Sequence, residues 1–271
     1  MSDLLAEVDG WGAGFAAAAV VDAEGVRAVH GDPDTVVRIA SVTKLMTSMA
    51  VLLAVEEGAT TLEEPAGPPG STVRHLLAHA GGYDFDSPKV LAAPGERRIY
   101  SNTGYDVLAA HVEERTGLPF AEYLHLGLLE PLGMSATELR GSAAKDVWST
   151  LTDLCRFASE LLSPTVLHGS TMAVWRTEQF PGLAGVLPGW GRQDPCPWGL
   201  GPELRGTKQP HWTGATAPPG TYGHFGGSGT FLWVDPERSL ACILLTDRDF
   251  GPWAVEAWPP FSDRVRAAFG G

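Results

Sequence analysis

The sequence predicts a mixed α/β (α+β) protein in which one antiparallel sheet, formed from both ends of the chain, is flanked by helices and carries a small, mostly helical lobe. Strand-like runs occur near both ends, at 15–32 and 229–248, whereas helical patterns dominate between them. Hydrophobic residues make up 44% of the 271 residues and charged residues 19%, an ordinary globular balance. We therefore expect a single domain over 1–271, with the helical lobe inserted at roughly 60–205.

The first strands and the first long helix follow one another directly. The segment "FAAAAVVDAEGVRAVHGD" (15–32) predicts two strands joined by a turn at Asp22–Gly25. The apolar run "LMTSMAVLLAV" (45–55) predicts a buried helix that starts at Ser41. Gly58 is a suitable residue to end it.

The middle of the chain predicts four more helices. The first is short, is capped by Ser71 or Thr72 and stops at Gly81. The segments are "VRHLLAHA", "SNTGYDVLAAHVEERTG", "PFAEYLHLGLLEPLGM" and "STLTDLCRFASELLSP". In the last of these, Thr150-x-x-Asp153 resembles a capping box. We expect a loop around 84–98 and irregular structure over 163–222, where Pro, Gly and Trp are frequent.

The end of the chain returns to a strand pattern. "GTFLWVDPERSLACILLTDR" (229–248) predicts two strands around an Asp-Pro-Glu-Arg turn, and "GPWAVEAWPPFSDRVRAAFG" predicts a closing helix. The economical arrangement joins this hairpin to the N-terminal one in a single sheet.

Charge and composition exclude several classes of protein. The net charge is −13 and no basic patch is visible, which argues against a nucleic-acid partner. No apolar run reaches the roughly 18–20 residues of a membrane span, and the N-terminus lacks a basic region before its apolar run. These features predict a soluble, cytoplasmic protein without a membrane partner, and they leave the oligomeric state open. The three cysteines, Cys155, Cys196 and Cys242, predict buried small side chains rather than a disulfide framework or a zinc site.

A lysine at the mouth of the apolar helix is the first chemical signal. Ser41 and Lys44 are three residues apart, so a helix would put both side chains on one face. A serine hydroxyl needs a base to become a nucleophile, and a lysine can be that base if burial lowers its pKa. Ser142 and Lys145 repeat the spacing without an apolar helix behind them. We expect that second pair to lie in a solvated loop and to be irrelevant to turnover.

Two further segments give this pair a context. "RRIYSNTGYDVL" places Tyr100-Ser101-Asn102 at a helix start, and "TYGHFGGSGT" places His224-Phe225-Gly226 before the last strands. Ser-x-x-Lys, Tyr-x-Asn and His-x-Gly in this order resemble the penicillin-recognising serine hydrolases, in the branch of class C β-lactamases, D-alanyl-D-alanine carboxypeptidases and related esterases. Framing segments such as "TVRHLLAHAGG" and "LLEPLGM" extend the resemblance over most of residues 15–250. It implies the β-lactamase/transpeptidase-like fold.

The resemblance also implies roles for the motif residues. Ser41 would attack an ester or amide carbonyl and become an acyl-enzyme. Lys44 and Tyr100 would share the work of the base, the ammonium lowering the pKa of the tyrosine. Asn102 would hold the acyl-side amide of the substrate. His224 stands where many relatives carry lysine, and would donate to a carboxylate or to Tyr100 with a charge that varies near neutral pH.

Glycines complete the implied site. The oxyanion hole would consist of the backbone N–H groups of Ser41 and Gly227. Gly226 would let the substrate lie close along its strand.

The implied function is that of a serine esterase or amidase acting on a small-molecule ester or peptide-like amide, without a cofactor. Two departures weigh against β-lactamase or D-alanyl-D-alanine carboxypeptidase activity, namely the histidine in the third motif and the missing signal peptide. A biosynthetic transacylase and a catalytically silent binding module of the same fold remain alternatives. His75 and His79 are four residues apart, but there is no His-Glu-x-x-His and no obvious third ligand, so we expect no metal site.

Overall fold

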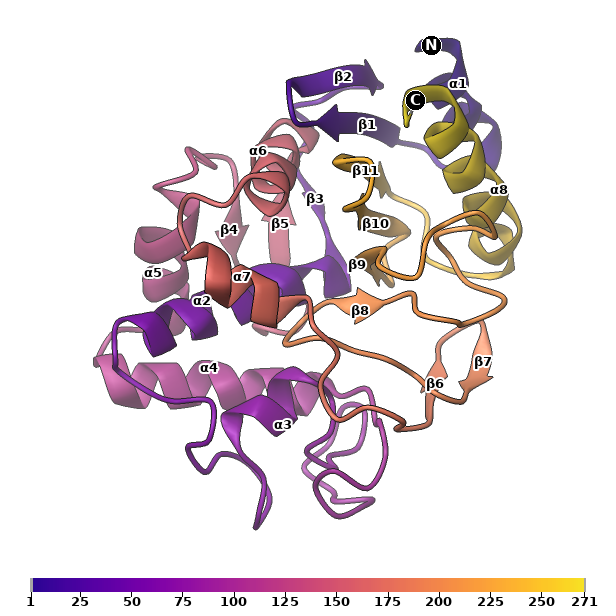
Figure 1. Cartoon of the computed structure of the whole chain (residues 1–271). Helices are drawn as coiled ribbons and strands as arrows, with labels where there is room; N and C mark the ends of the chain where they lie inside the picture. Colours follow the sequence, from indigo (N-terminus) through magenta and orange to yellow (C-terminus); the bar gives the residue numbers. More distant parts are fainter. Residues whose placement is uncertain (1, 271) are drawn as a thin grey trace.

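The computed structural model describes residues 2–270 of the chain, and its largest element is a six-stranded antiparallel sheet (Figure 1). The strand order is β2-β1-β11-β10-β9-β8. Their bounds are β1 Ala16–Asp22, β2 Gly25–His30, β8 Glu203–Leu204, β9 Tyr222–Gly226, β10 Thr230–Asp235 and β11 Leu240–Thr246. Strand β1 pairs with β11 over its whole length, from Ala16 opposite Thr246 to Asp22 opposite Leu240. The predicted sheet from both chain ends and both predicted hairpins are confirmed.

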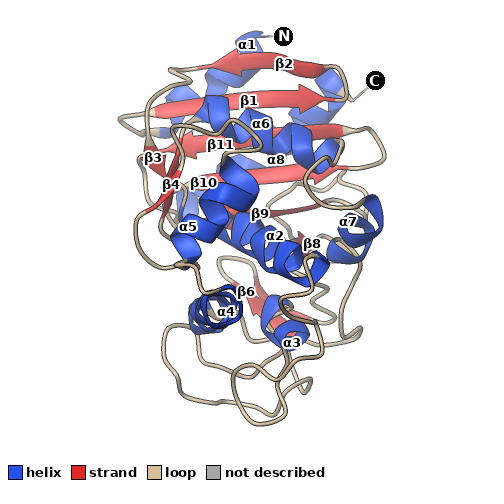
Figure 2. Cartoon of the chain, turned by 90° about the vertical axis from the view of Figure 1, so that its left-hand side faces the viewer, coloured by secondary structure: helices blue, strands red, loops and turns tan. Residues whose placement is uncertain are grey.

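Both faces of this sheet are covered by helices, which explains why β11 is buried along its whole length. Alternate residues of a strand point to opposite faces, and they enter two separate cores. Ala17 and Ile243 pack with helices α2 and α6, whereas Ala18 and Cys242 pack with α8 and the N-terminal segment. Figure 2 shows α2 (Thr43–Glu56), α5 (Phe120–Leu124) and α6 (Leu151–Leu162) on the near face and α8 (Pro252–Phe269) behind the sheet.

The remaining helices lie beyond the β9 end of the sheet or beside it. Helix α3 (Val73–Leu77) and helix α4 (Asn102–Thr116) lie next to each other below the strands (Figure 2). The caps follow the sequence: Ser101 accepts a hydrogen bond from Gly104 N–H, Thr150 accepts one from Asp153 N–H, and Gly117 ends α4 with a positive φ. The four helices predicted between 73 and 164 are therefore present.

The structure differs from the prediction in several details. The first turn of the long helix is a 3-10 turn, Ala40–Val42, and α3 already ends at Leu77. The region 163–222, predicted to be irregular, contains α7 (Gly169–Trp175) and the short strands β6 (Gly185–Leu187), β7 (Gly191–Gln193) and β8. Strands of two or three residues give too few positions for a periodic signal. The same holds for a second sheet, β3-β5-β4, formed by Val37–Arg38, Val147–Ser149 and Glu138–Leu139.

Two compositional expectations have structural counterparts. All three cysteines are free thiols and buried, as predicted. Among the helices of the described residues, none combines the length and the apolarity that crossing a lipid bilayer requires.

Candidate active site

Ser41 lies at a strained turn between strand β3 and helix α2. Ala40 has a φ of +45°, a conformation that non-glycine residues rarely adopt and that costs of the order of 1–3 kcal/mol. Every residue from Ile39 to Leu52 is buried except Ser41. The turn therefore presents one polar side chain to the surface from an otherwise buried segment.

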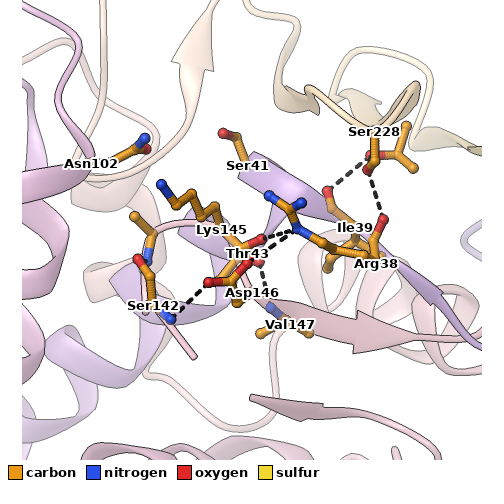
Figure 3. Close-up of polar contacts among 12 residues, drawn as sticks. Arg38, Ile39, Ser41, Thr43, Asn102, Ser142, Lys145, Asp146, Val147 and Ser228 are labelled. Carbon is orange, nitrogen blue, oxygen red and sulfur yellow. Dashed lines mark hydrogen bonds and ion pairs between the residues drawn. The ribbon is translucent and has the colours of Figure 1, made fainter. Parts of the chain in front are cut away.

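Contacts from two directions hold this turn (Figure 3). On one side, Ser228 donates to the Arg38 carbonyl at 2.7 Å and Thr230 donates to the Ile39 carbonyl at 2.9 Å. On the other side, Arg38 forms an ion pair with Asp146 at 3.1 Å. The Ser41 hydroxyl points away from these contacts, on the side of Asn102 (Figure 3). The strain at Ala40 is thus maintained by the last strands and by the segment before β5.

Lys44 is fully buried one turn after Ser41, as the mechanism implied by the sequence requires. Its Nζ atom lies 3.3 Å from Ser41 Oγ, 2.6 Å from Asn102 Oδ1 and 2.9 Å from the Ala144 carbonyl oxygen. Burial lowers the pKa of Lys44 well below its ordinary value, and the positive charge of Lys145 lowers it further, while Asp106 and Asp86 oppose the shift.

A neutral Lys44 can satisfy all three of its partners. Amide and backbone carbonyl oxygens only accept hydrogen bonds, so Asn102 Oδ1 and Ala144 O take the two N–H groups. The nitrogen lone pair is then left for the Ser41 hydroxyl. A deprotonated Lys44 next to a partly exposed serine is the arrangement that general-base activation needs.

Tyr100 is held in place by His79. The His79 carbonyl accepts a hydrogen bond from Ile99 N–H at 2.9 Å, and its Nδ1 accepts one from Ser101 N–H at 3.2 Å, so both neighbours of Tyr100 are fixed. The two rings also pack together, with centroids 4.5 Å apart. His79 is buried and has a φ of +54°. Sequence reasoning did not identify this positioning role, because it depends on where the loop after α3 runs.

The expectation that Lys44 lowers the pKa of Tyr100 is wrong. Burial raises the pKa of Tyr100 well above its ordinary value, and the contact with Ser41 offsets only part of that effect. The geometry explains why: Lys44 Nζ lies 4.6 Å from the centre of the Tyr100 ring, over its face. Tyr100 is therefore protonated at neutral pH, which leaves Lys44 as the stronger candidate for the base.

His224 also differs from the expectation. Its Nδ1 lies 2.7 Å from the Phe225 carbonyl oxygen, an obligate acceptor, so Nδ1 carries the proton. Nε2 is then an acceptor, and the Tyr100 hydroxyl donates to it at 3.4 Å. Burial lowers the pKa of His224 to about 3. The ring is neutral near pH 7 and offers no N–H to a substrate carboxylate, contrary to the role expected from the sequence.

Both polar atoms of the Asn102 side-chain amide form hydrogen bonds. Oδ1 accepts from Lys44, while Nδ2 donates to Asp86 at 3.2 Å. Asp86 in turn forms an ion pair with Lys145 at 3.1 Å, and Figure 3 shows the Lys145 side chain reaching toward Asn102. Asp86 is a site residue that sequence reasoning missed, since it sits in a stretch predicted only as a loop.

The second Ser-x-x-Lys segment is a loop, as expected, but it is only partly solvated. Ala143 and Ala144 are buried, and the Ala143 carbonyl accepts from Thr47 at 2.6 Å. Ala144 supplies one of the three Lys44 partners. The segment packs across the start of α2 because β5 pairs with β3 directly before the Ser41 turn.

The two predicted glycines lie at the β9–β10 turn. A Cβ on Gly226 would come within 2.4 Å of the Ile39 carbonyl oxygen, so the glycine allows β9 to approach the Ser41 turn. Gly227 follows and is exposed. The sequence predicted that Gly226 allows a substrate to approach its strand closely. The packing of β9 against the Ser41 turn already requires a glycine at this position.

The two histidines weighed as metal ligands have other partners. His75 Nδ1 lies 2.9 Å from Thr72 Oγ1 and its ring stacks on Phe180, while His79 lies beyond the end of α3. Within residues 2–270, no group of three or more His, Cys, Asp or Glu side chains is arranged to hold a metal ion.

Comparisons with known proteins found a matching family model and similar sequences. A family model described as beta-lactamase matches residues 5–264. In sequence, the chain is 24% identical over 286 residues to the D-alanyl-D-alanine-carboxypeptidase/endopeptidase AmpH of Escherichia coli, a match that covers 79% of this chain and 71% of that protein.

Solved structures extend the comparison. A beta-lactamase from Mycobacterium bovis is 50% identical, with a TM-score of 0.97 and coverage of 99% of this chain and 100% of that chain. The simvastatin synthase LovD of Aspergillus terreus superposes with a TM-score of 0.78 at 17% identity, covering 99% of this chain and 98% of that one. At that identity the likeness shows a common fold alone.

Proposed function

The chain belongs to the beta-lactamase family of serine acyl-enzyme hydrolases and transferases, and from this premise we propose that it is a serine esterase or amidase that uses Ser41 as nucleophile and Lys44 as base. The observation that carries the proposal is the set of partners around Lys44 Nζ. Two obligate acceptors and one hydroxyl surround a fully buried amine. That set is satisfied when Lys44 is neutral and accepts the serine proton.

The reaction then proceeds in two balanced steps. As the Ser41 Oγ–carbon bond forms, the hydroxyl proton moves to Lys44 Nζ, and the bond to the alcohol or amine breaks as Tyr100 protonates the leaving group. Lys44 returns a proton to Tyr100. Water then attacks the carbonyl carbon of the acyl-enzyme and gives its proton to Lys44 or Tyr100. The acid leaves as a proton from these groups returns to Ser41 Oγ.

Stabilisation of the oxyanion is assigned to two backbone N–H groups, those of Ser41 and Gly227. Their positions support this role because Gly226 brings the β9–β10 turn against the Ser41 turn. Asn102 fixes Lys44 through Oδ1 and Asp86 fixes Asn102. We therefore assign Asn102 a positioning role beside the substrate-binding role expected from the sequence.

The protonation and hydrogen bonding of the His224 ring favour substrates without a carboxylate next to the scissile bond. Its one N–H is used by the Phe225 carbonyl and its lone pair by Tyr100. A penicillin or a D-alanyl-D-alanine peptide carries a carboxylate next to the scissile bond and would meet no donor from this ring. Simple esters and amides do not need one.

The test is the mass of the intact protein after brief exposure to p-nitrophenyl acetate and, separately, to a penicillin. We expect an acetyl adduct with release of p-nitrophenol in the wild type, and neither in Ser41→Ala. The matched control is Ser142→Ala, which has the same substitution in the other Ser-x-x-Lys segment and should form the adduct.

The outcomes separate the candidate functions. A penicillin adduct that forms faster than the acetyl adduct would replace the esterase proposal by β-lactamase or carboxypeptidase chemistry, which the similarity to the Mycobacterium bovis beta-lactamase favours. Transfer of the acetyl group to an added amine in preference to water would indicate a transacylase. Absence of every adduct from the folded wild type would point to a binding module.

A further inference from the structure

A pocket of about 550 Å³ opens against Tyr100 on the side of strand β6. Its wall is mostly apolar and includes Phe85, Leu91, Ile99 and Val186. Three of these side chains are large, hydrophobic and unusually accessible, with relative exposures of 50% for Phe85, 37% for Leu91 and 65% for Val186. Exposed apolar side chains that gather in one concave place mark a binding site more often than scattered ones do.

The pocket is built on a rigid floor. Arg98 is buried there and its guanidinium donates to the carbonyl oxygens of Cys196 and Gln179 at 3.0 and 2.9 Å. Its backbone N–H donates to Ala184 at 2.9 Å. A Cβ on Gly185 would lie 2.8 Å from Arg98 Cβ, so the glycine lets β6 lie directly on this residue. Arg98 thus connects the segment before Tyr100 to strand β6, which forms one wall of the pocket.

The rim of the pocket carries positive charge in a chain whose net charge is −13. Arg97 is exposed, and its guanidinium donates to the Leu91 carbonyl at 2.9 Å rather than to a carboxylate. Arg192 forms an exposed ion pair with Asp194 at 3.0 Å. Glu96 also lines the pocket, but its carboxylate accepts from Ala93 N–H. Arg97 is therefore the cation best placed to meet an anionic group.

The position of the pocket next to Tyr100 determines which part of a substrate would enter it. Tyr100 lines the pocket and is the proton donor to the leaving group in the proposed mechanism. Ser41, Lys44 and Asn102 do not line it, so Tyr100 is the catalytic group through which the pocket meets the reaction.

We propose that this pocket binds the leaving group of the substrate, and that the preferred leaving group is an apolar chain of about six carbons ending in a carboxylate. The inference rests on the proposed function, since it takes Tyr100 as the acid for that group. A carboxylate at the far end would pair with Arg97 on the rim of the pocket. This location is consistent with the lack of a free donor on His224.

The experiment compares three acetate esters that form the same acetyl-enzyme: ethyl acetate, hexyl acetate and 6-acetoxyhexanoate, with release of acetate as the readout. Leaving-group contacts act only before acylation, so they change kcat/KM and leave the deacylation rate unchanged. We expect kcat/KM to increase about tenfold from ethyl to hexyl acetate and several-fold more for 6-acetoxyhexanoate. Tenfold is well below what full burial of four methylene groups would give.

Two variants test the two parts of the pocket. Val186→Trp fills the pocket from an exposed position and should lower kcat/KM for hexyl acetate and for 6-acetoxyhexanoate to about the value for ethyl acetate. Its control is Val26→Trp on β2, also exposed (52%) and outside this pocket, which should behave as the wild type. Arg97→Gln should remove the preference for 6-acetoxyhexanoate over hexyl acetate and nothing else.

Failure of this inference is distinct from failure of the proposed function. If Ser41-dependent hydrolysis shows no preference among the three esters, or if Val186→Trp leaves the preference intact, the pocket is not the leaving-group site although the enzyme is a serine hydrolase. If Arg97→Gln lowers all three rates equally, the carboxylate part is wrong. If ethyl acetate hydrolysis does not need Ser41, the proposed function itself fails.

Discussion

The chain contains two Ser-x-x-Lys segments with identical spacing, and their lysines lie in opposite environments. Lys44 is fully buried at the start of α2, with its amine between Ser41, Asn102 and Ala144. Lys145 lies in a loop, its side chain is 31% exposed, and its amine forms an ion pair with Asp86. Figure 3 shows Ser41, Ser142 and Lys145 around the same turn.

The comparison shows that the Ser-x-x-Lys spacing identifies candidate catalytic lysines, whereas burial identifies which of them can act as the base. Burial disfavours the charged form of a lysine amine, and of these two lysines Lys44 is the one that is fully buried. The second segment nevertheless contributes to the site. It supplies the Ala144 carbonyl to Lys44 and a cation to Asp86, so the two segments are parts of one arrangement.

The largest effect should come from replacing the buried lysine. Lys44→Met removes the proposed base and keeps the apolar stem, so we expect acylation by p-nitrophenyl acetate to fall by about a thousandfold or more, within the range for loss of general-base and nucleophile activation. Stopped-flow release of p-nitrophenol measures it, and circular dichroism should show a folded protein. Acylation at the wild-type rate in this variant would remove Lys44 from the mechanism.

The same variant should change how stability depends on pH. In the unfolded chain Lys44 has its ordinary pKa, near 10.4, whereas burial lowers its pKa in the folded protein. Between the two pKa values the folded state binds fewer protons, so the unfolding free energy of the wild type increases with pH relative to Lys44→Met. In that range the difference between the two proteins should increase by up to about 1.4 kcal/mol per pH unit and should level off above the unfolded-state pKa.

Urea unfolding at several pH values measures this slope, and taking the difference between the two proteins cancels groups that titrate alike in both. Parallel stability curves would mean that Lys44 carries its proton in the folded state. In that case Tyr100 would again be the better candidate for the base.

A smaller effect is expected at the exposed lysine. Lys145→Met, the matched counterpart of the first variant, removes a positive charge that lowers the pKa of Lys44 and leaves Asp86 without its ion-pair partner. We expect kcat/KM at pH 7 to fall about three- to tenfold and the acid limb of its pH profile to move to higher pH. The sequence alone predicts that Lys145 has no influence on turnover, and this measurement decides between the two predictions.

The shift of the pH profile is the informative readout, since a loss of packing alone would lower the rate equally at every pH. A profile that superposes on that of the wild type would restore the interpretation of Lys145 as a solvated loop residue.

The smallest effect is expected at Ser142. Its hydroxyl donates to Asp106 at 2.6 Å and accepts from Ala144 N–H at 3.1 Å, contacts that shape the loop without reaching the Ser41 turn. Ser142→Ala should change kcat/KM by less than about twofold and lower the unfolding free energy by about 1 kcal/mol. A loss of activity comparable to that of Ser41→Ala would show that the wrong serine was chosen.

Patterns that lie within one element were readable from the sequence alone. The hairpins at 15–32 and 229–248, the caps at Ser101 and Thr150, and the apolar helix behind Lys44 depend on residues that are neighbours in the chain. The order of the three motifs also identified the family, since motif order is a property of the sequence. The short strands β6–β8 were missed because two or three residues do not establish a period.

The protonation states needed the tertiary structure. Lys44, Tyr100 and His224 come from three distant segments, and each pKa depends on which carbonyl, ring or charge another segment brings to it. Asp86, His79 and Lys145 entered the site for the same reason, through hydrogen bonds and ion pairs across more than 15 positions of sequence. The sequence by itself determined the residues of the three motifs, and the packing decided which other groups join them and how each pKa shifts, because desolvation and hydrogen-bond geometry arise only when the segments meet.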